Sequence, residues 1–154
     1  KKNLSIIKSV NKSNKNRSKL LLERVYGILN KKVKNKQITF LGVTFKANTD
    51  DMRDSPSLTM IPALVKKGAK IKYFDPTGYK KEFSKLKNVY NSSTIKESII
   101  GSDFVIIHTE WNDFKSINFK NLVRGKKFII FDMRNIYSAK KIRNQGFKYY
   151  SIGR

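Results

Sequence analysis

Short apolar runs rich in β-branched and aromatic residues alternate with helix-like segments from residue 37 to the end of the chain. The runs are ITFLGV at 38–43, KIKYFD at 70–75, FVIIHT at 104–109, KFIIFD at 127–132 and FKYYSI at 147–152. ITFLGV, FVIIHT and KFIIFD are typical of strands buried in a parallel sheet, and KIKYFD and FKYYSI are also interpreted as strands. Because helix-like segments separate them, we expect right-handed crossovers between the strands.

Capping and turn residues indicate where the helices between these runs begin and end. Ser55, Pro56 and Ser57 precede the apolar segment 58–67. They predict a helix start, since proline fits a first helical turn and serine is a good cap. Gly68 follows that segment, where a glycine commonly ends a helix. Further elements are predicted at 92–102 (helix), 138–145 (helix), 82–87 (short helix) and 89–90 (brief strand).

The first 36 residues are helix-like but belong to a different pattern. Apolar residues recur there at helical spacing in two groups, Leu4, Ile7 and Val10, then Leu21, Leu22, Val25, Ile28 and Leu29. A polar stretch without proline joins the groups, so one long helix with a solvated middle and two separate helices both fit. The sequence therefore predicts a helical arm at 1–35, followed at 36–154 by a Rossmann-like α/β domain with a parallel sheet flanked by helices.

The charge balance is strongly basic, with 34 Lys and Arg against 11 Asp and Glu and a formal net charge of +23. Such a surface either attracts nucleic acid or anionic lipid, or reflects lysines scattered over solvent-facing positions. Lysines recur at the boundaries of the predicted elements, and no basic stretch interleaves aromatics as single-strand binding surfaces do. We therefore favour scattered lysines over nucleic-acid binding.

Other compositional features narrow the class of protein. No apolar run approaches the roughly 20 residues of a membrane-spanning helix, and the N-terminal stretch lacks the apolar core of a signal peptide. We expect a cytoplasmic protein with no membrane partner. The chain has no cysteine and a single histidine, His108, so it contains no cysteine nucleophile and a histidine-rich metal site is disfavoured. No catalytic or metal-binding residue is assigned.

In open parallel sheets, ligands bind beyond the carboxyl ends of the strands. The longest segment of this kind lies within LGVTFKANTDDMRDSPSL at 41–58. A dinucleotide site would need G-x-G-x-x-G there, but only Gly42 is present, which argues against an independent NAD site. Lys46 and Arg53 are instead placed to contact anionic groups, the arginine with bidentate geometry available.

Acidic residues surround these two cations. Asp50, Asp51 and Asp54 would either hold the cations in place or favour the positive end of the following helix.

Other strand-end residues have ordinary structural interpretations beside functional ones. Asp75 and Asp132 would contact a ribose or cap a turn. His108 and Trp111 are interpreted as packing residues, and Glu110 is not assigned.

Four stretches resemble the UDP-glucose/GDP-mannose dehydrogenase family. Residues 41–76 resemble the opening of that family's C-terminal, UDP-sugar-binding domain. SDFVIIHTEWNDFK resembles its strand followed by T-E-W, and FIIFDMRNIY resembles its D-x-R-N strand end. VNKSNKNRSKLLLERV is similar to the end of the central helix that joins the two domains. The match covers essentially the whole chain in the family's order and spacing.

The resemblance implies residue roles and partners. Members oxidise UDP-glucose to UDP-glucuronate in two NAD-dependent steps, in a cleft between an N-terminal NAD domain and this one, and pair as homodimers through the central helix. Phe45 and Lys46 correspond to positions that contact the UDP-sugar, the lysine near its phosphates. Arg134 of D-x-R-N is associated with substrate binding, and Arg53 corresponds to the arginine that reaches the NAD.

The family's nucleophilic cysteine and glycine-rich NAD fingerprint lie upstream of the central helix, and neither occurs here. The resemblance therefore implies the C-terminal portion of such an enzyme, inactive alone. One alternative is a family member acting on another nucleotide sugar, such as a UDP-N-acetyl sugar or GDP-mannose. An alternative from another class is a basic module that dimerises through its helix or binds nucleic acid.

Overall fold

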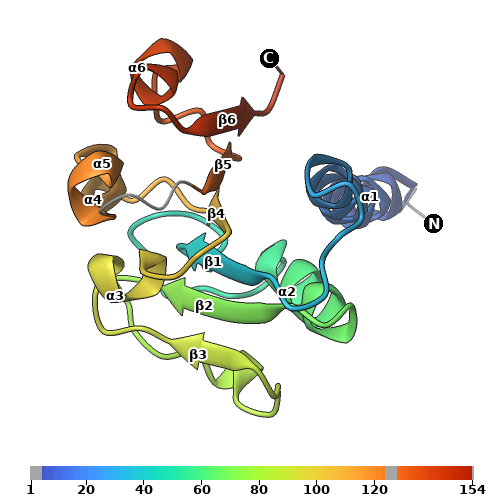
Figure 1. The fold of residues 1–154 in the computed structure, drawn as a ribbon. Coiled ribbons are helices and arrows are strands. Elements are labelled where there is room, and N and C mark those ends of the chain that lie inside the picture. The colour runs from blue at the N-terminus through green and yellow to red at the C-terminus, as the bar shows by residue number, and fades with distance from the viewer. Residues whose placement is uncertain (1–4, 124–127, 154) are drawn as a thin grey trace.

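A single parallel sheet of six strands organises the chain, in the order β3-β2-β1-β4-β5-β6 (Figure 1). This computed structural model describes residues 5–123 and 128–153, with side chains of the first helix described from Asn16 onward. The strands are β1 (Gln37–Leu41), β2 (Lys70–Phe74), β3 (Val89–Asn91), β4 (Phe104–Ile107), β5 (Ile129–Asp132) and β6 (Lys148–Ser151). The predicted Rossmann-like α/β fold is confirmed.

Helices cover both faces of this sheet. They are α1 (Ser5–Ile28), α2 (Ser57–Lys66), α3 (Ile95–Ile99), α4 (Asn112–Lys115), α5 (Phe119–Leu122) and α6 (Ala139–Asn144), with a 3₁₀ turn η1 (Lys81–Phe83). α1 and α2 pack on one face, and α3, α4, α5 and α6 pack on the other (Figure 1). The sequence did not predict α4 and α5, because a single helical turn is too short to show a period.

Of the two arrangements left open for the arm, the structure has one continuous helix, which ends at Ile28. Leu4 lies outside the described residues, as do the side chains of Ile7 and Val10. The division into an arm at 1–35 and a domain at 36–154 stays a prediction. Among the described helices, none combines the length and apolar character that a membrane crossing requires.

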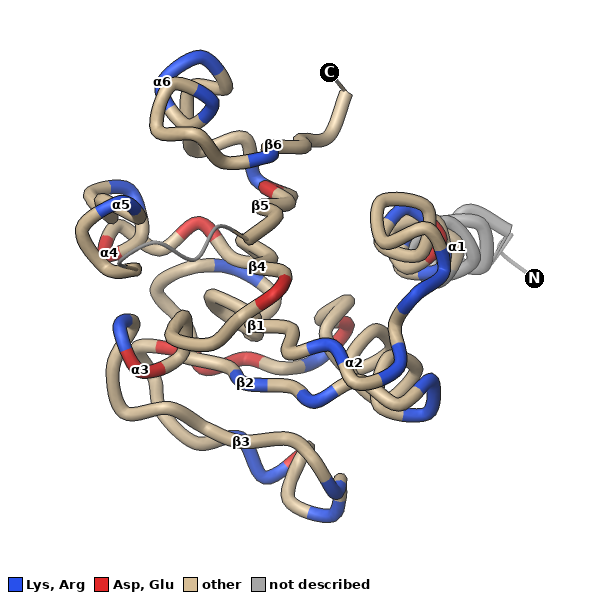
Figure 2. The backbone as a smooth tube through the Cα atoms, viewed as in Figure 1, with Lys and Arg blue, Asp and Glu red and all other residues tan. Residues whose placement is uncertain are grey.

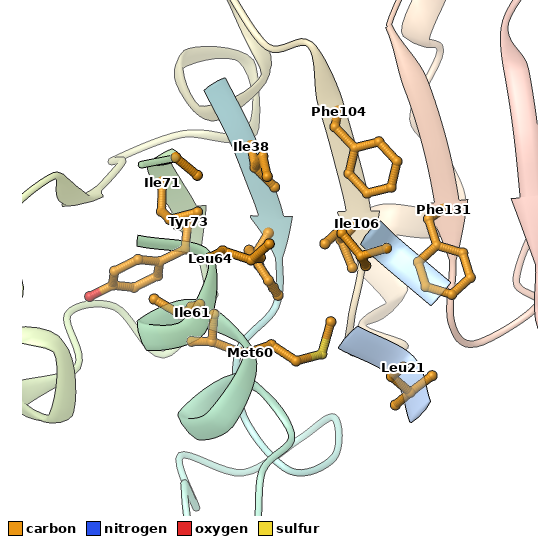
Figure 3. Packing of buried hydrophobic residues seen from close by; sticks show 14 of the residues in the cluster. Leu21, Ile38, Met60, Ile61, Leu64, Ile71, Tyr73, Phe104, Ile106 and Phe131 are labelled. Carbon is orange, nitrogen blue, oxygen red and sulfur yellow. The ribbon is translucent and has the colours of Figure 1, made fainter. Parts of the chain in front are cut away.

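Alternating side chains of each strand supply a separate hydrophobic cluster on each face. In β4, Phe104 and Ile106 face α1 and α2, whereas Val105 and Ile107 face the opposite layer. Figure 3 shows Met60, Ile61 and Leu64 of α2 packed against the first of these faces. All of these side chains are completely buried. Burial on both faces is why β1, β4 and β5 are mostly apolar in the sequence.

The helical arm packs on the domain through one stripe of side chains. Leu21, Val25 and Leu29 are four residues apart, as one helix face requires, and all three are buried in the sheet's core. Between them, Arg24 donates to the carbonyl of Ser151 at 2.5 Å, and its guanidinium carbon lies 5.7 Å from the centroid of the Phe131 ring. This stripe of α1 is therefore occupied within the chain itself.

Candidate functional site

A pocket of about 190 Å³ lies where the carboxyl ends of β1 and β5 meet the side of α1. Phe45 and Lys46 line it from the segment after β1, and Arg134 lines it from the segment after β5. The three residues predicted to contact the UDP-sugar thus lie around one hollow, although Arg134 is 89 positions from Phe45. β1 and β5 flank β4 in the sheet, which is why residues so distant in sequence meet.

Arg134 is held in place by the backbone of two other strand-end segments. Its Nε donates to the carbonyl of His108 at 2.7 Å, and its Nη2 donates to the carbonyl of Phe45 at 3.0 Å. The carboxylate of Glu110 places Oε2 3.0 Å from the same Nε. The guanidinium is therefore fixed before any ligand binds, and this lowers the entropic cost of binding an anion.

The segment after β1 folds back on itself to present Phe45 and Lys46. The backbone N–H of Phe45 donates to the carbonyl of Asp51 at 2.9 Å, and the hydroxyl of Thr44 donates to the carbonyl of Lys46 at 3.1 Å. The Phe45 ring is 44% exposed and Lys46 is exposed, so both remain available to a ligand.

Arg53 lies outside the pocket, on the solvent side of the same loop. Its Nε and Nη2 donate to the two carboxylate oxygens of Asp51 at 3.0 and 2.9 Å, while its side chain stays 89% exposed. These hydrogen bonds, together with the arginine's charge, lower the pKa of Asp51 to about 2. One of the three loop acids therefore does hold a cation, and Arg53 is oriented outward.

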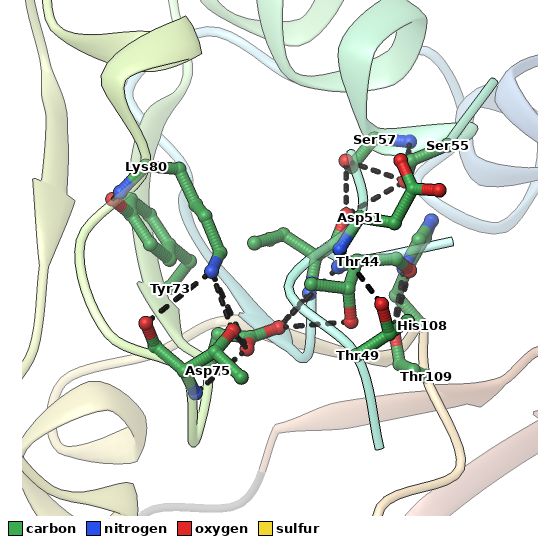
Figure 4. Close-up of polar contacts among 12 residues, drawn as sticks. Thr44, Thr49, Asp51, Ser55, Ser57, Tyr73, Asp75, Lys80, His108 and Thr109 are labelled. Carbon is green, nitrogen blue, oxygen red and sulfur yellow. Dashed lines mark hydrogen bonds and ion pairs between the residues drawn. The ribbon is translucent and has the colours of Figure 1, made fainter. Parts of the chain in front are cut away.

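The other two loop acids do not form this kind of ion pair with Arg53. Asp54 lines the pocket and adopts a left-handed backbone conformation with φ of 59°. Asp50 is exposed. The helix start is instead tied to the sheet by serines, since the hydroxyls of Ser55 and Ser57 each donate to the carbonyl of Val43 at 2.6 Å (Figure 4).

Asp75 has a structural role at the end of β2. One carboxylate oxygen accepts the backbone N–H groups of Val43 and Thr44 at 2.8 and 3.3 Å (Figure 4). The other accepts the backbone N–H and hydroxyl of Thr77 at 3.0 and 2.5 Å, and Nζ of the buried Lys80 lies 3.8 Å away. Asp75 was predicted either to contact a ribose or to cap a turn, and the structure shows the second role.

Asp132 is used in the same way at the end of β5. It accepts the backbone N–H groups of Arg134 at 2.9 Å and Tyr137 at 3.1 Å, and the hydroxyl of Tyr149 at 2.8 Å. The residue is completely buried. Its bonds fix the backbone from which the Arg134 side chain extends.

The chain's own residues do not form a dinucleotide cradle after β1. A phosphate cradle needs free backbone N–H groups and glycines that let the backbone approach the ligand. Here the amides of Val43 and Thr44 are bonded to Asp75, and the space above Gly42 is filled, because a Cβ built there would lie 2.5 Å from Cβ of Thr109. The contact of Arg53 with NAD stays a prediction.

His108 and Trp111 are buried, as predicted. Nδ1 of His108 lies 3.0 Å from the hydroxyl of Thr109, and Nε2 has no hydrogen-bond partner among the described residues. Burial, followed by the charge of Arg134, lowers the pKa of His108 to about 3, so the ring is neutral at physiological pH. Glu110, which was not assigned a role from the sequence, pairs with Arg134.

Sequence reasoning also missed the contribution of α1 to the pocket. Arg17 and Ser18 line it from the helix, one turn before the buried Leu21. The signal was present, because residues three and four positions before a buried helix residue share its face. Arg17 adds a third cation beside Lys46 and Arg134, so the pocket carries an excess of positive charge over the single carboxylate of Asp54.

Comparison with known proteins identifies the fold and its family. Residues 39–139 match the UDP binding domain of the UDP-glucose/GDP-mannose dehydrogenase family. The chain is 38% identical over 152 residues to UDP-glucose 6-dehydrogenase of Rickettsia bellii, covering 96% of this chain and 35% of the relative. It is 36% identical over 153 residues to UDP-glucose 6-dehydrogenase YwqF of Bacillus subtilis, covering 97% and 34%. The chain thus spans about a third of the length of the curated relatives it matches.

Solved structures agree on the fold. A UDP-glucose dehydrogenase from Pyrobaculum islandicum superposes with a TM-score of 0.73 at 23% identity, covering 96% of this chain and 32% of that one. A UDP-D-ManNAc dehydrogenase from Pyrococcus horikoshii superposes with a TM-score of 0.69 at 26% identity, covering 98% and 33%. The chain belongs to the UDP-glucose/GDP-mannose dehydrogenase family and contains its UDP-binding domain.

Proposed function

We propose that this chain is the substrate-binding part of an NAD-dependent UDP-glucose 6-dehydrogenase, which oxidises UDP-glucose to UDP-glucuronate, and that the pocket receives the UDP group. The observation that carries the proposal is the convergence of Phe45, Lys46 and Arg134 on one pocket at the carboxyl edge of the sheet. The family resemblance predicts a UDP-sugar contact for each of these three residues, and the family match covers residues 39–139.

The charges around the pocket suit a diphosphate. Lys46 supplies an exposed point charge, and Arg134 supplies a guanidinium already oriented by two carbonyls. Arg17 adds charge from α1. The outward Arg53 is proposed to contact the NAD of the whole protein, which supplies the hydride acceptor when bound.

On this proposal the chain binds nucleotide but does not turn it over by itself. It contains no cysteine to act as the nucleophile, and its own backbone does not form a dinucleotide cradle. We further propose a homodimer joined through α1 in the whole protein. Because Leu21 and Val25 pack on the chain's own sheet, a partner would contact another side of α1, which includes Leu20, 71% exposed.

Calorimetric titration with UDP at low salt tests the pocket. Lys46→Ala is expected to weaken binding by more than about tenfold, since a charge-assisted phosphate contact contributes about 1.5–3 kcal/mol. Lys120→Ala, on an exposed lysine of α5, is the matched control and should leave the affinity unchanged. Equal affinities for the Lys46→Ala variant and the unmodified chain would show that the pocket is not the phosphate site.

A second candidate is a dehydrogenase of another nucleotide sugar. The chain is 28% identical over 156 residues to UDP-N-acetyl-D-mannosamine dehydrogenase of Methanocaldococcus jannaschii. Competition titrations with UDP-glucose, a UDP-N-acetyl sugar and GDP-mannose separate the candidates. Preference for either of the last two ligands over UDP-glucose would exclude the primary assignment.

A further inference from the structure

The two edges of the sheet differ in their balance of acidic and basic residues. We call the edge where the parallel strands begin the amino edge. In its described segments, 29–37, 66–70, 84–88, 100–103 and 145–148, the only acid is Asp103. The lysines of these segments are Lys31, Lys32, Lys34, Lys36, Lys66, Lys67, Lys70, Lys85, Lys87 and Lys148.

Seven of the chain's eleven acids lie at the opposite edge, where the strands end. They are Asp50, Asp51, Asp54, Asp75, Glu110, Asp113 and Asp132. A general enrichment in lysine would add positive charge to both edges equally and would not remove acids from one of them. The proposed UDP pocket does not account for this asymmetry, because it lies at the opposite edge.

The lysine-bearing segments before β1, β2 and β3 lie side by side. The backbone N–H of Asn35 donates to the carbonyl of Gly68 at 2.8 Å, and that of Lys70 donates to the carbonyl of Lys36 at 2.9 Å. The N–H of Ile71 donates to the carbonyl of Asn88 at 2.8 Å. Figure 2 shows the Lys and Arg segments gathered in the α1–β1 connection and at the end of α2.

This row of segments is level and its charge is largely uncompensated. Gln37 pairs with Lys70, and Ile71 pairs with Val89, so the three strands begin at nearly the same height. At about 4.8 Å per strand spacing, the row crosses about 10 Å. Lys36 pairs with Asp103 at 3.7 Å, whereas the remaining lysines of the amino edge are exposed to solvent.

We propose that the amino edge is a docking surface for the anionic headgroups of a phospholipid bilayer. A level array of point charges on long side chains matches a flat surface with diffuse negative charge. Each lysine near such a surface raises the affinity of the protein for it about fivefold. The cations of the described amino-edge segments are all lysines, which lack the bidentate fork that arginine offers to a nucleic-acid phosphate.

The surface does not suit nucleic acid in other respects. The large apolar side chains that are exposed in the described chain are Leu20, Phe45, Tyr79, Tyr90, Ile100 and Tyr150, and none lies before β1 or β2, where single-strand binding would need a stacking platform. The lipid contact is peripheral, since no described helix is suited to cross the bilayer. It departs from the expectation of no membrane partner.

Vesicle co-sedimentation tests the proposal. The chain should bind vesicles that contain phosphatidylglycerol and not vesicles of phosphatidylcholine alone. Binding should be lost on going from about 0.1 M to about 1 M salt, as the screening length falls from about 10 Å to about 3 Å. Reversal of four amino-edge charges, Lys34→Glu, Lys67→Glu, Lys70→Glu and Lys87→Glu, should weaken binding by more than about a hundredfold.

A matched variant separates the amino edge from overall charge. Lys96→Glu, Lys120→Glu, Lys140→Glu and Lys141→Glu change the net charge by the same amount at exposed positions elsewhere. An equal loss in both variants would overturn the proposal, as would tighter binding to duplex DNA than to the anionic vesicles, or no binding to either vesicle. Circular dichroism checks that each variant is folded, and the corresponding Lys→Gln set should give a smaller loss in the same order.

Discussion

Asp75 at the end of β2 is only 2% exposed and accepts the backbone N–H of Val43, just after β1, across 2.8 Å. The same carboxyl group also bonds Thr44 and Thr77 and lies beside Lys80. One side chain therefore fixes the path along which the chain leaves β1 and enters the loop that carries the candidate ligand-binding residues.

Asp75→Ala is expected to lower the free energy of unfolding by about 3–5 kcal/mol. It leaves the buried amides of Val43 and Thr44 without their acceptor, and it leaves the buried Lys80 without its carboxylate. Urea unfolding measures the change. The exposed Asp50→Ala is the control and should stay within about 0.5 kcal/mol of the unmodified chain. A loss similar to the control would mean that Asp75 does not hold the end of β1.

Gly42→Ala should destabilise the chain more than an ordinary replacement of a left-handed glycine. Gly42 has φ of 76°, and a Cβ there would lie 2.5 Å from Cβ of Thr109. The alanine would therefore suffer both backbone strain and a steric clash with an atom that is bonded directly to the backbone. We expect a loss of more than about 2 kcal/mol. Gly101 has φ of 83° but nothing within 4 Å of its Cβ position, which makes Gly101→Ala the control for strain alone. Thermal or urea unfolding measures the free energy of unfolding of both variants. Equal losses in Gly42→Ala and Gly101→Ala would contradict the predicted clash with Thr109.

Stability should fall with acidification between about pH 6 and pH 4.5 because of His108. The folded chain holds the pKa of His108 at about 3, against an ordinary value of 6.5, so the unfolded chain binds the proton first. The stabilisation is thus complete above pH 6.5 and decreases at about 1.4 kcal/mol per pH unit as the pH falls towards 3. Burial is the main cause, with the charge of Arg134 second and Asp75 opposing them.

Urea unfolding at successive pH values measures this slope, and His108→Asn should remove it. Asparagine keeps a polar group near the hydroxyl of Thr109 but does not titrate. Asp51, whose pKa is lowered to about 2, loses its contribution only below its ordinary value of 3.8, so the interval from pH 6 to 4.5 isolates the histidine. An unchanged slope in the His108→Asn variant would assign the pH dependence to other groups.

Arg134→Lys is expected to weaken UDP binding by about tenfold although it keeps the charge. A lysine cannot bond the carbonyls of His108 and Phe45 together, so the cation loses its fixed position. Calorimetry gives the affinity and unfolding gives the stability of the same sample. Arg143→Lys on α6 makes the same chemical change at an exposed position and should bind UDP normally. Normal binding by Arg134→Lys would indicate that charge alone is needed.

The strands could be predicted because burial on both faces leaves a direct record in the sequence. ITFLGV is mostly apolar because β1 lies in the middle of the sheet, and the same holds for FVIIHT in β4. No comparable record exists for α4 and α5, which are four residues each. The spacing of apolar residues in the arm could not decide between one helix and two, because a solvated polar middle is compatible with both.

The candidate site, like the fold, could be predicted from the sequence only in part. Lys46 and Arg53 could be selected because they follow a predicted strand and stand in one loop. The hydrogen bond between Arg134 and Phe45 could not be predicted from spacing, since it depends on β4 lying between β1 and β5. The different environments of the two loop cations, one beside a pocket and one paired outward with Asp51, required the folded loop.

The helix α1 supplies a wall of the pocket through Ser18 and a ridge of the core through Leu21, one turn further along the same face. Neither contact can be adjusted by itself, because both side chains belong to one rigid rod. A force applied to α1 that rotates it about its axis would withdraw Leu21 from the sheet and change the width of the pocket in the same movement. The position of α1 therefore links the packing of the core to the space available in the pocket.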